Sequence, residues 1–352
     1  MSIDTIPIRR GEELNTIELS AYLTEHFDLS SGDLRIEQFA SGASNLTYLL
    51  TIDGRDLVLR RPPFGNTVKT AHDMRREFDV LSKLSMVYSP APKPLMFCGD
   101  ESVIGSEFYL MERRHGLILR GEVPQIVEDS LTTQRSVCDS FIANLASLHA
   151  VDHRDAGLAE LGKPDGYVRR QIEGWSKRYF AAKTDEHSEL EHAIRWLQND
   201  MPGESGIAIV HNDYKFDNVM LDPNDLSSIN TVLDWEMVTV GDPLMDLGTT
   251  LGYWMSKDAG VEMMKMPFNP RVLMENVSRT DLAEMYAEHS GRDISNILFY
   301  YVFGTVKIAV IAQQIFARFK KGLTHDERFG HFDVFVKTLG RIALRAIDAK
   351  QI

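Results

Sequence analysis

Polar residues of the types that phosphoryl transfer requires are concentrated in one short segment. The segment VHNDYKFDNVMLD, residues 210–222, holds within eight positions His211, Asp213, Lys215, Asp217 and Asn218. Phosphoryl transfer needs a carboxylate that orients the attacking hydroxyl and accepts its proton. It also needs positive charge that offsets the charge developing on the moving group. The segment therefore contains the residue types for this chemistry.

A second polar cluster follows a short apolar interval. Residues 232–246, VLDWEMVTVGDPLMD, hold Asp234, Glu236, Asp242 and Asp246. Two apolar, strand-like pieces, Val219–Leu221 and Ile229–Leu233, separate the clusters, and a hairpin of these pieces would bring Asn218 and Asp234 together at one end. One neutral and one anionic oxygen are ligands that Mg²⁺ accepts. The spacing therefore predicts Asn218 and Asp234 as a metal-binding pair.

The elements that must position these residues begin with a β-rich first third of the chain. Asp53-Gly54 lies between alternating apolar residues in Asn45–Arg61, a pattern typical of a tight hairpin because both turn positions favour positive φ. Ala71–Leu84 has apolar residues at helical spacing. The other strand candidates are Leu34–Phe39, Leu46–Ile52, Leu95–Cys98 and Phe108–Glu112. We expect a small antiparallel sheet carrying one helix.

The remainder of the chain is mainly helical, with the two polar clusters in a short β-like island. The predicted helices are Leu131–Ala150, Gly166–Ala182, Glu186–Asn199, Asp281–Glu288, Ile294–Phe319 and Asp333–Ala349. The change from strands to helices falls near Glu112–Gly116, so we expect an α+β protein with two domains, residues 1–112 and 113–352.

The polar clusters resemble the catalytic segments of a known family. His211, Asp213 and Asn218 match the kinase pattern H-x-D-x-x-x-x-N, and Asp234 begins a D-W-E triplet. Together with Gly241-Asp242-Pro243 and without an A-P-E segment, this is similar to the aminoglycoside phosphotransferase-like (choline-kinase-like) family and not to protein kinases. The resemblance implies a two-lobed protein-kinase-like fold, ATP and Mg²⁺ as cofactors, and a small-molecule hydroxyl as acceptor.

The resemblance also assigns roles within the second part of the chain. Asp213 would be the catalytic carboxylate, Lys215 a phosphate contact, and Asn218 and Asp234 the Mg²⁺ ligands. His211 would support the metal loop through the backbone. Glu236 either reaches a metal through water or caps the loop. Asp242 is expected to cap a helix, and Asp246 to brace the catalytic loop.

In the first part, the resemblance implies nucleotide contacts. The turn of small residues that would cover the ATP phosphates comprises Ser41, Gly42, Ala43, Ser44 and Asn45. Arg60, with Glu77 on the next helix, stands where protein kinases have a phosphate-binding Lys, and Arg can still clamp phosphate. Strand alternation leaves Arg61 as a rival for Arg60. Adenine would meet the backbone at Met111 and Glu112.

The resemblance identifies the phosphate acceptor less directly than the site residues. V-L-R-x-x-P-P at Arg60 resembles the branch of the family found beside acyl-CoA dehydrogenase-like proteins, which suggests a hydroxyacyl-CoA or hydroxy acid. Aminoglycoside, choline or homoserine kinases are the alternatives. A nucleotide-binding pseudokinase is a further reading, supported by Arg in place of Lys, and a hydrolase that activates water is a third.

Composition limits the partners. The 352 residues carry a net charge of −13, which argues against nucleic acid because phosphate backbones need a basic surface. The N-terminal residues have no apolar core typical of a signal peptide, and Tyr300–Phe319 is too polar to span a bilayer. We expect a cytoplasmic protein without a membrane partner, and nothing in the sequence sets an oligomeric state.

Three smaller groups of residues receive structural interpretations. Cys98 and Cys138 are expected to be reduced, buried thiols, and His149 a packed residue near a helix end. The methionines after Trp254 are Met255, Met263, Met264 and Met266. We expect core packing for them, with a lid over an apolar acyl group as the alternative.

Overall fold

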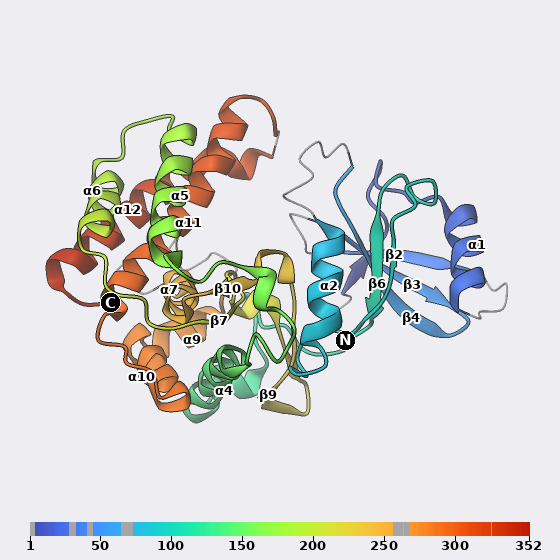
Figure 1. The fold of residues 1–352 in the computed structure, drawn as a ribbon, viewed down its shortest axis with the longest axis horizontal. Helices are drawn as coiled ribbons and strands as arrows, with labels where there is room; N and C mark the ends of the chain where they lie inside the picture. Colours follow the sequence, from blue (N-terminus) through green and yellow to red (C-terminus); the bar gives the residue numbers. More distant parts are fainter. Residues whose placement is uncertain are drawn as a thin grey trace. The chain divides into compact units, whose positions relative to one another are not determined.

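A computed structural model describes residues 4–27, 33–40, 45–64, 73–255, 263, 268–324 and 326–352. Contacts between residues divide the chain into two compact units, Met1–His115 and Gly116–Ile352 (Figure 1). The α+β class, with an antiparallel sheet in the first unit and a mostly helical second unit, is confirmed.

The first unit contains a sheet in which every neighbouring pair of strands is antiparallel. The strand order is β1-β2-β3-β4-β6-β5. The strands are β1 (Thr5–Ile6), β2 (Arg35–Phe39), β3 (Leu46–Ile52), β4 (Arg55–Arg61), β5 (Pro94–Cys98) and β6 (Phe108–Glu112). The sequence did not indicate β1, which contributes two residues at the edge.

The hairpin between β3 and β4 forms at the predicted dipeptide. Asp53 and Gly54 have φ values of 50° and 71°, and Ile52 pairs with Arg55 directly beside them. Positive φ at both central residues is the backbone of the turn that suits the twist of paired strands. This local signal therefore fixes the register of the strand that carries Arg60.

Two helices pack on the sheet of the first unit. The predicted helix is α2 (Met74–Leu84), which begins where the Asp73 side chain accepts a hydrogen bond from the Arg76 N–H. The other, α1 (Thr16–Phe27), was not predicted. It buries Leu19 and Leu23 in a core that includes Leu57 and Leu59 of β4.

The second unit contains the helices that sequence periodicity predicts, with ends shifted by a few residues. These are α4 (Leu131–Ala150), α5 (Tyr167–Ala182), α6 (Ser188–Asn199), α10 (Arg279–Ser290), α11 (Ile297–Lys320) and α12 (Phe332–Ala349). The unit also has α3 (Gln125–Glu128), α7 (Pro243–Tyr253) and α9 (Arg271–Asn276). Each residue of α7 is buried, so this helix has no amphipathic stripe from which periodicity could identify it.

The long helix α11 forms the core of the second unit. It packs against α5, α6, α7 and α12 (Figure 1). Among the described residues, this helix alone is long and apolar enough to cross a membrane, but 78% of its most apolar window is buried inside the protein. The prediction of a buried helix at Tyr300–Phe319 is therefore confirmed.

Helices α7 and α11 meet through glycine. A Cβ atom at Gly304 would lie 1.9 Å from the carbonyl oxygen of Gly248, and a Cβ at Gly248 would lie 2.1 Å from the carbonyl oxygen of Tyr300. Both distances are shorter than atoms can approach, so the backbones touch only because neither residue has a side chain. This contact fixes the distance between the two helices.

The second unit also contains two short antiparallel pairs of strands. One pairs β7 (Ala208–Val210) with β10 (Thr239–Gly241), and the other pairs β8 (Val219–Asp222) with β9 (Asp225–Val232). The first polar cluster lies between β7 and β8, whereas the second begins between β9 and β10 with Asp234 and Glu236 and continues into the start of α7 with Asp242 and Asp246. The predicted pairing of the apolar pieces between the clusters is confirmed.

Candidate active site

The first polar cluster forms a loop between β7 and β8, residues 211–218, which we call the catalytic loop. It ends in a 3₁₀ turn, Phe216–Asn218. Asn212 has φ of 68°, a left-handed conformation that costs free energy for a residue other than glycine. The loop therefore requires contacts that hold this conformation.

The Asp213 carboxylate is held by three donors. Lys215 Nζ lies 2.6 Å from Oδ2, and Asn218 Nδ2 donates to the same oxygen at 3.0 Å. The Tyr253 hydroxyl donates to Oδ1 at 2.8 Å. The side chains of Asp213 and Lys215 are only 16% and 13% exposed, so these charge-assisted bonds are weakly screened.

The charge of Lys215 is maintained by its neighbours. Burial acts to lower its pKa, but the Asp213 carboxylate, followed by Asp217 and Asp234, outweighs burial and raises the pKa. Lys215 is therefore a fixed cation beside the carboxylate, consistent with a role in offsetting phosphate charge.

The two predicted metal ligands lie at the same end of the β8–β9 hairpin. Val219 pairs with Val232, and the Leu233 N–H donates to the Asn218 carbonyl at 2.8 Å. Asp234 follows with φ of 64°. The side-chain nitrogen of Asn218 donates to Asp213. The amide oxygen of Asn218 is therefore turned away from the Asp213 carboxylate.

These residues fit a magnesium ion that is shared with phosphate. One amide oxygen and one carboxylate are the oxygen ligands that Mg²⁺ takes when substrate phosphates and water complete its shell. Among the described residues no group of three or more His, Cys, Asp or Glu could hold a metal ion alone. That Asn218 and Asp234 hold Mg²⁺ stays a prediction.

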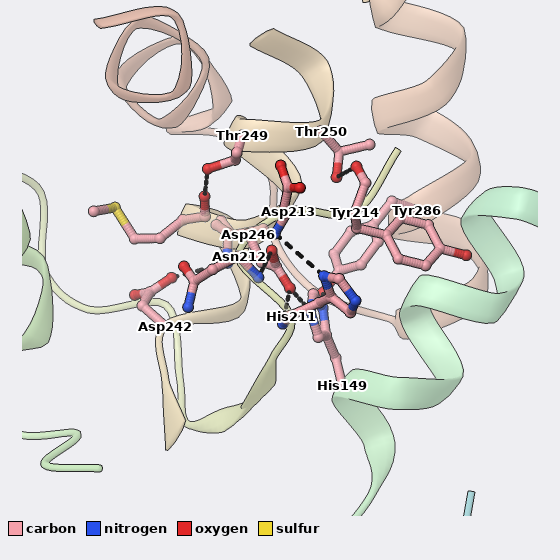
Figure 2. A network of polar contacts seen from close by, with 12 residues as sticks. His149, His211, Asn212, Asp213, Tyr214, Asp242, Asp246, Thr249, Thr250 and Tyr286 are labelled. Carbon is pink, nitrogen blue, oxygen red and sulfur yellow. Dashed lines mark hydrogen bonds and ion pairs between the residues drawn. The ribbon is translucent and has the colours of Figure 1, made fainter. Parts of the chain in front are cut away.

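Helix α7 supports the catalytic loop from one of its faces. Asp246 accepts from the His211 and Asn212 N–H groups at 2.6 and 2.7 Å, as Figure 2 shows. Thr250 donates to the Tyr214 carbonyl at 2.9 Å, and Tyr253 reaches Asp213. Positions 246, 250 and 253 are spaced by four and three residues, so they share one face of the helix.

Asp246 is itself buried and braced from a second helix. His149 Nε2 lies 3.2 Å from Asp246 Oδ2, and His149 Nδ1 lies 2.7 Å from the Tyr286 hydroxyl (Figure 2). Burial would raise the pKa of Asp246, but the hydrogen bond from His149 and the charge of nearby Lys307 outweigh it and lower the pKa. Asp246 is therefore an anion that accepts from the catalytic loop.

His211 links the two polar clusters. Its Nδ1 accepts from the Asp213 N–H at 3.2 Å, so Nε2 carries the proton and donates to the Leu233 carbonyl at 2.9 Å. Its ring packs on Trp235, with centroids 4.8 Å apart. With both nitrogens engaged by the backbone, His211 holds the catalytic loop against the strand that leads to Asp234.

Lys307 of α11 also supports the loop and was not anticipated from the sequence. Its Nζ donates to the Asn212 carbonyl at 2.7 Å. The Asn212 side chain is held as well. Its Nδ2 donates to the Met237 carbonyl at 3.0 Å, and its Oδ1 accepts from the Tyr167 hydroxyl at 3.3 Å. Burial lowers the pKa of Lys307 to about 8, although Asp246 and Asp213 oppose this shift.

The other acidic residues of the second cluster have different surroundings. Asp242 is the N-cap of α7, accepts from the Leu244 N–H at 2.9 Å, and accepts from the Ser205 N–H and hydroxyl at 2.6 Å. Burial raises the pKa of Asp242 despite these hydrogen bonds. Glu236 lies in the 3₁₀ turn Trp235–Met237, two residues after Asp234.

In the first unit, Arg60 and Glu77 form the predicted pair. Arg60 Nε lies 3.2 Å from Glu77 Oε2, and the two side chains are 11% and 3% exposed. Arg61 faces the opposite side of β4, where its guanidinium donates to the Ile104 carbonyl at 3.0 Å. The geometry favours Arg60 over Arg61 as the residue paired with α2.

The remaining predicted nucleotide residues are partly outside the described chain. Ser41, Gly42, Ala43 and Ser44 lie outside the described residues, whereas Asn45 is buried directly before β3. Met111 and Glu112 end β6, and the Glu112 carboxylate accepts from the Lys93 N–H at 2.8 Å.

The residues that received structural interpretations can also be placed. Met264 and Met266 are outside the described residues, whereas Met255 and Met263 are buried. Cys98, Cys138 and His149 are buried, as predicted.

Comparisons with known proteins identify the family. A model of the phosphotransferase enzyme family matches residues 35–265. The Gallus gallus protein named acyl-CoA dehydrogenase family member 11 is 33% identical over 349 residues, which are 97% of this chain and 44% of that protein. The chain thus spans less than half the length of this relative.

Solved structures share the fold over almost the whole chain. A putative aminoglycoside phosphotransferase from Ralstonia eutropha is 28% identical, with a TM-score of 0.78 over 95% of this chain and 98% of that one. An aminoglycoside phosphotransferase in complex with ADP and hygromycin B is 14% identical, with a TM-score of 0.59 over 94% and 98% of the two chains. The second likeness bears on the fold alone.

Proposed function

Since the chain belongs to the phosphotransferase enzyme family, we propose that it transfers the γ-phosphoryl group of ATP to a hydroxyl of a small molecule. The observation that carries this proposal is the Asp213 carboxylate, which lies between Lys215, Asn218 and Tyr253 in a loop fixed by Asp246. A carboxylate held in this way can orient a hydroxyl and accept its proton.

Each predicted residue has a distinct part in the proposed reaction. Asn218 and Asp234 would hold Mg²⁺, which supplies positive charge to the phosphates when bound. Asp213 orients the acceptor hydroxyl and takes its proton as the oxygen attacks. Lys215, whose charge is stabilised by the carboxylates around it, offsets charge on the transferred group. Arg60, oriented by Glu77, would contact the phosphates of the nucleotide.

The acceptor that we favour is a hydroxyacyl-CoA or a related hydroxy acid. Support comes from the relatives named acyl-CoA dehydrogenase family members, which this chain matches over nearly its full length. The names of these relatives refer to acyl-CoA chemistry, and the Leu57-Val58-Leu59-Arg60 strand with Pro62-Pro63 is the sequence feature that resembles this branch.

A second candidate acceptor is an amino sugar or amino alcohol. The similarity to a putative aminoglycoside phosphotransferase at 28% identity supports this alternative. The two candidates differ in charge, because a CoA ester is an anion and an aminoglycoside is a cation. Acceptor charge is therefore the property that an assay should vary.

The test is ATP consumption at saturating Mg²⁺ with hydroxyacyl-CoAs, hydroxy acids, amino alcohols and aminoglycosides as acceptors. We expect ADP release that depends on a hydroxyacyl acceptor and is lost in Asp213→Ala. Turnover with amino sugars alone would replace the acceptor class and leave the kinase proposal intact. If ATP binds by thermal shift and no acceptor is phosphorylated, the kinase proposal is wrong and a nucleotide-binding regulator takes its place.

A further inference from the structure

The two oxygens of the Asp213 carboxylate have different partners. Oδ2 accepts from Lys215 at 2.6 Å and from Asn218 at 3.0 Å, both members of the catalytic loop. Oδ1 accepts from the Tyr253 hydroxyl at 2.8 Å, and Tyr253 is the last residue of α7. The tyrosine therefore contacts the oxygen that Lys215 and Asn218 leave open to an incoming hydroxyl.

Tyr253 is held in this position by its own contacts. Its carbonyl oxygen accepts from Asn269 Nδ2 at 3.1 Å, and Asn269 Oδ1 accepts from the Phe216 N–H at 3.0 Å. Its ring lies 5.0 Å from the Phe268 ring centroid and 5.0 Å from Lys215 Nζ. Tyr253 is thus attached to the catalytic loop twice, by its carbonyl through Asn269 and by its hydroxyl directly.

The phenol can act only as a hydrogen-bond donor to Asp213. Burial, followed by the charge of Asp213, raises the pKa of Tyr253 well above its ordinary value. An un-ionised phenol next to a carboxylate donates its proton to the hydrogen bond and does not compete as a base. The hydroxyl therefore keeps its proton and donates it to Oδ1.

We propose that Tyr253 is a positioning residue that occupies Oδ1 of Asp213 in the absence of acceptor and so suppresses transfer of phosphate to water. This inference rests on the proposed kinase function. Water and a substrate hydroxyl would compete for the same carboxylate oxygen, and the phenol takes the place that a water molecule would fill. A substrate gains binding energy from the rest of its structure, which water lacks, so it alone can share or displace this contact.

The two competing reactions differ only in the attacking oxygen. In transfer, a bond forms between the acceptor oxygen and Pγ, the bond between Pγ and the β–γ bridging oxygen breaks, and ADP leaves with that electron pair. The acceptor proton passes to Asp213. In hydrolysis, water supplies the oxygen, its proton passes to the same carboxylate, and the product is inorganic phosphate. Tyr253 acts on both through Asp213.

The test is the rate of ADP release from ATP and Mg²⁺ without any acceptor. We expect Tyr253→Phe, which removes only the hydroxyl, to raise this rate about tenfold, the ratio that corresponds to losing one hydrogen bond to a charged group. The double variant Tyr253→Phe with Asp213→Asn should lose the increase. Tyr253→Leu provides a second variant if the phenylalanine variant folds poorly, and should show the same rise.

A matched control is Tyr179→Phe. The Tyr179 ring is fully buried in α5 and its hydroxyl donates to Glu191 at 3.1 Å, so the substitution removes a buried phenol outside the site. The proposal is wrong if acceptor-free hydrolysis in Tyr253→Phe stays at the wild-type rate, or if the increase survives the loss of Asp213. Because no acceptor is present, these outcomes are separate from failure of the kinase proposal, which the wild-type acceptor panel reports.

Discussion

The catalytic loop of the second unit and strand β4 of the first unit carry their predicted phosphate chemistry on different kinds of support. Asp213 is positioned by residues distant in the sequence, among them Asp246, Tyr253 and Lys307. Arg60 projects from a regular strand and pairs with Glu77, only 17 positions later, on the next helix. Proton transfer requires exact placement of a carboxylate, whereas binding a polyphosphate requires charge at a suitable distance.

This difference separates the expected kinetic effects of substitutions in the two regions. Changes in the catalytic loop, at Asp246 and at Lys307 should lower kcat for transfer, because they displace the carboxylate that is proposed to act in the transition state. Changes at Arg60 should mainly raise KM for ATP, because they remove charge that is proposed to bind the nucleotide before and during the reaction. The predictions that follow test this separation.

The largest expected effect is at Asp213 itself. Asp213→Asn keeps the shape of the side chain and removes the proton acceptor, so kcat should fall by roughly 10²- to 10⁴-fold. ATP affinity, measured by thermal shift or calorimetry, should change little because the carboxylate is proposed to act on the acceptor. An equal loss of ATP affinity would contradict the assignment of Asp213 to the acceptor.

The next effect is expected at Asp246, which never contacts the reacting groups. Asp246→Asn replaces an anion that accepts two backbone N–H bonds with an amide that can place only one acceptor oxygen. We expect the free energy of unfolding to fall by about 3 kcal/mol, since charged neighbours lose a buried partner. Urea denaturation measures the stability, and kcat of the folded variant should fall while KM for ATP remains near the wild-type value.

A smaller effect, on KM for ATP and not on kcat, is expected at the Arg60–Glu77 pair of the first unit. Glu77→Gln removes the charge that orients Arg60, and Arg60→Lys removes its planar donor group. Each variant should raise KM for ATP about tenfold with little change in kcat. A double variant that is no worse than either single variant would show that the two side chains act as one unit. A fall in kcat as large as that of Asp246→Asn would remove the distinction between the regions.

The last expected effect concerns the pH dependence of stability. The pKa of Lys307 is about 8 in the folded protein and has an ordinary value of 10.5, so the unfolded chain binds more protons between these pH values. The free energy of unfolding of the wild type should therefore rise with pH across this window, by on the order of 3 kcal/mol relative to Lys307→Met. Urea denaturation at pH 7, 9 and 10.5 measures this difference, and parallel curves for the two proteins would contradict it.

The sequence predicted the parts of the molecule that depend on neighbouring residues. The Asp53-Gly54 turn, the amphipathic helices and the pairing of the apolar pieces on either side of the turn at 223–224 all follow from short-range patterns. The types and spacing of Asp213, Asn218 and Asp234 predicted which residues to examine as a site. Their roles remain predictions for the experiments above.

The supports of the site could not be predicted in the same way. Helix α7 is buried on all sides, so its residues show no periodic pattern, and α1 has only Leu19 and Leu23 buried. Lys307 lies in an apolar helix nearly a hundred residues from Asn212, and no local pattern connects the two. The spacing of Asp246, Thr250 and Tyr253 on one helical face was the available signal, and it becomes meaningful only once α7 is recognised as a helix.

The glycine contact between α7 and α11 has a consequence for how the protein tolerates inherited variation. Asp246 and Tyr253 lie on one of these helices and Lys307 on the other, and all three reach the same loop. A methyl group at Gly248 or Gly304 would push the helices apart and alter every one of these distances together. Inactive alleles should therefore include substitutions at these two positions, with every residue that touches the reaction still intact.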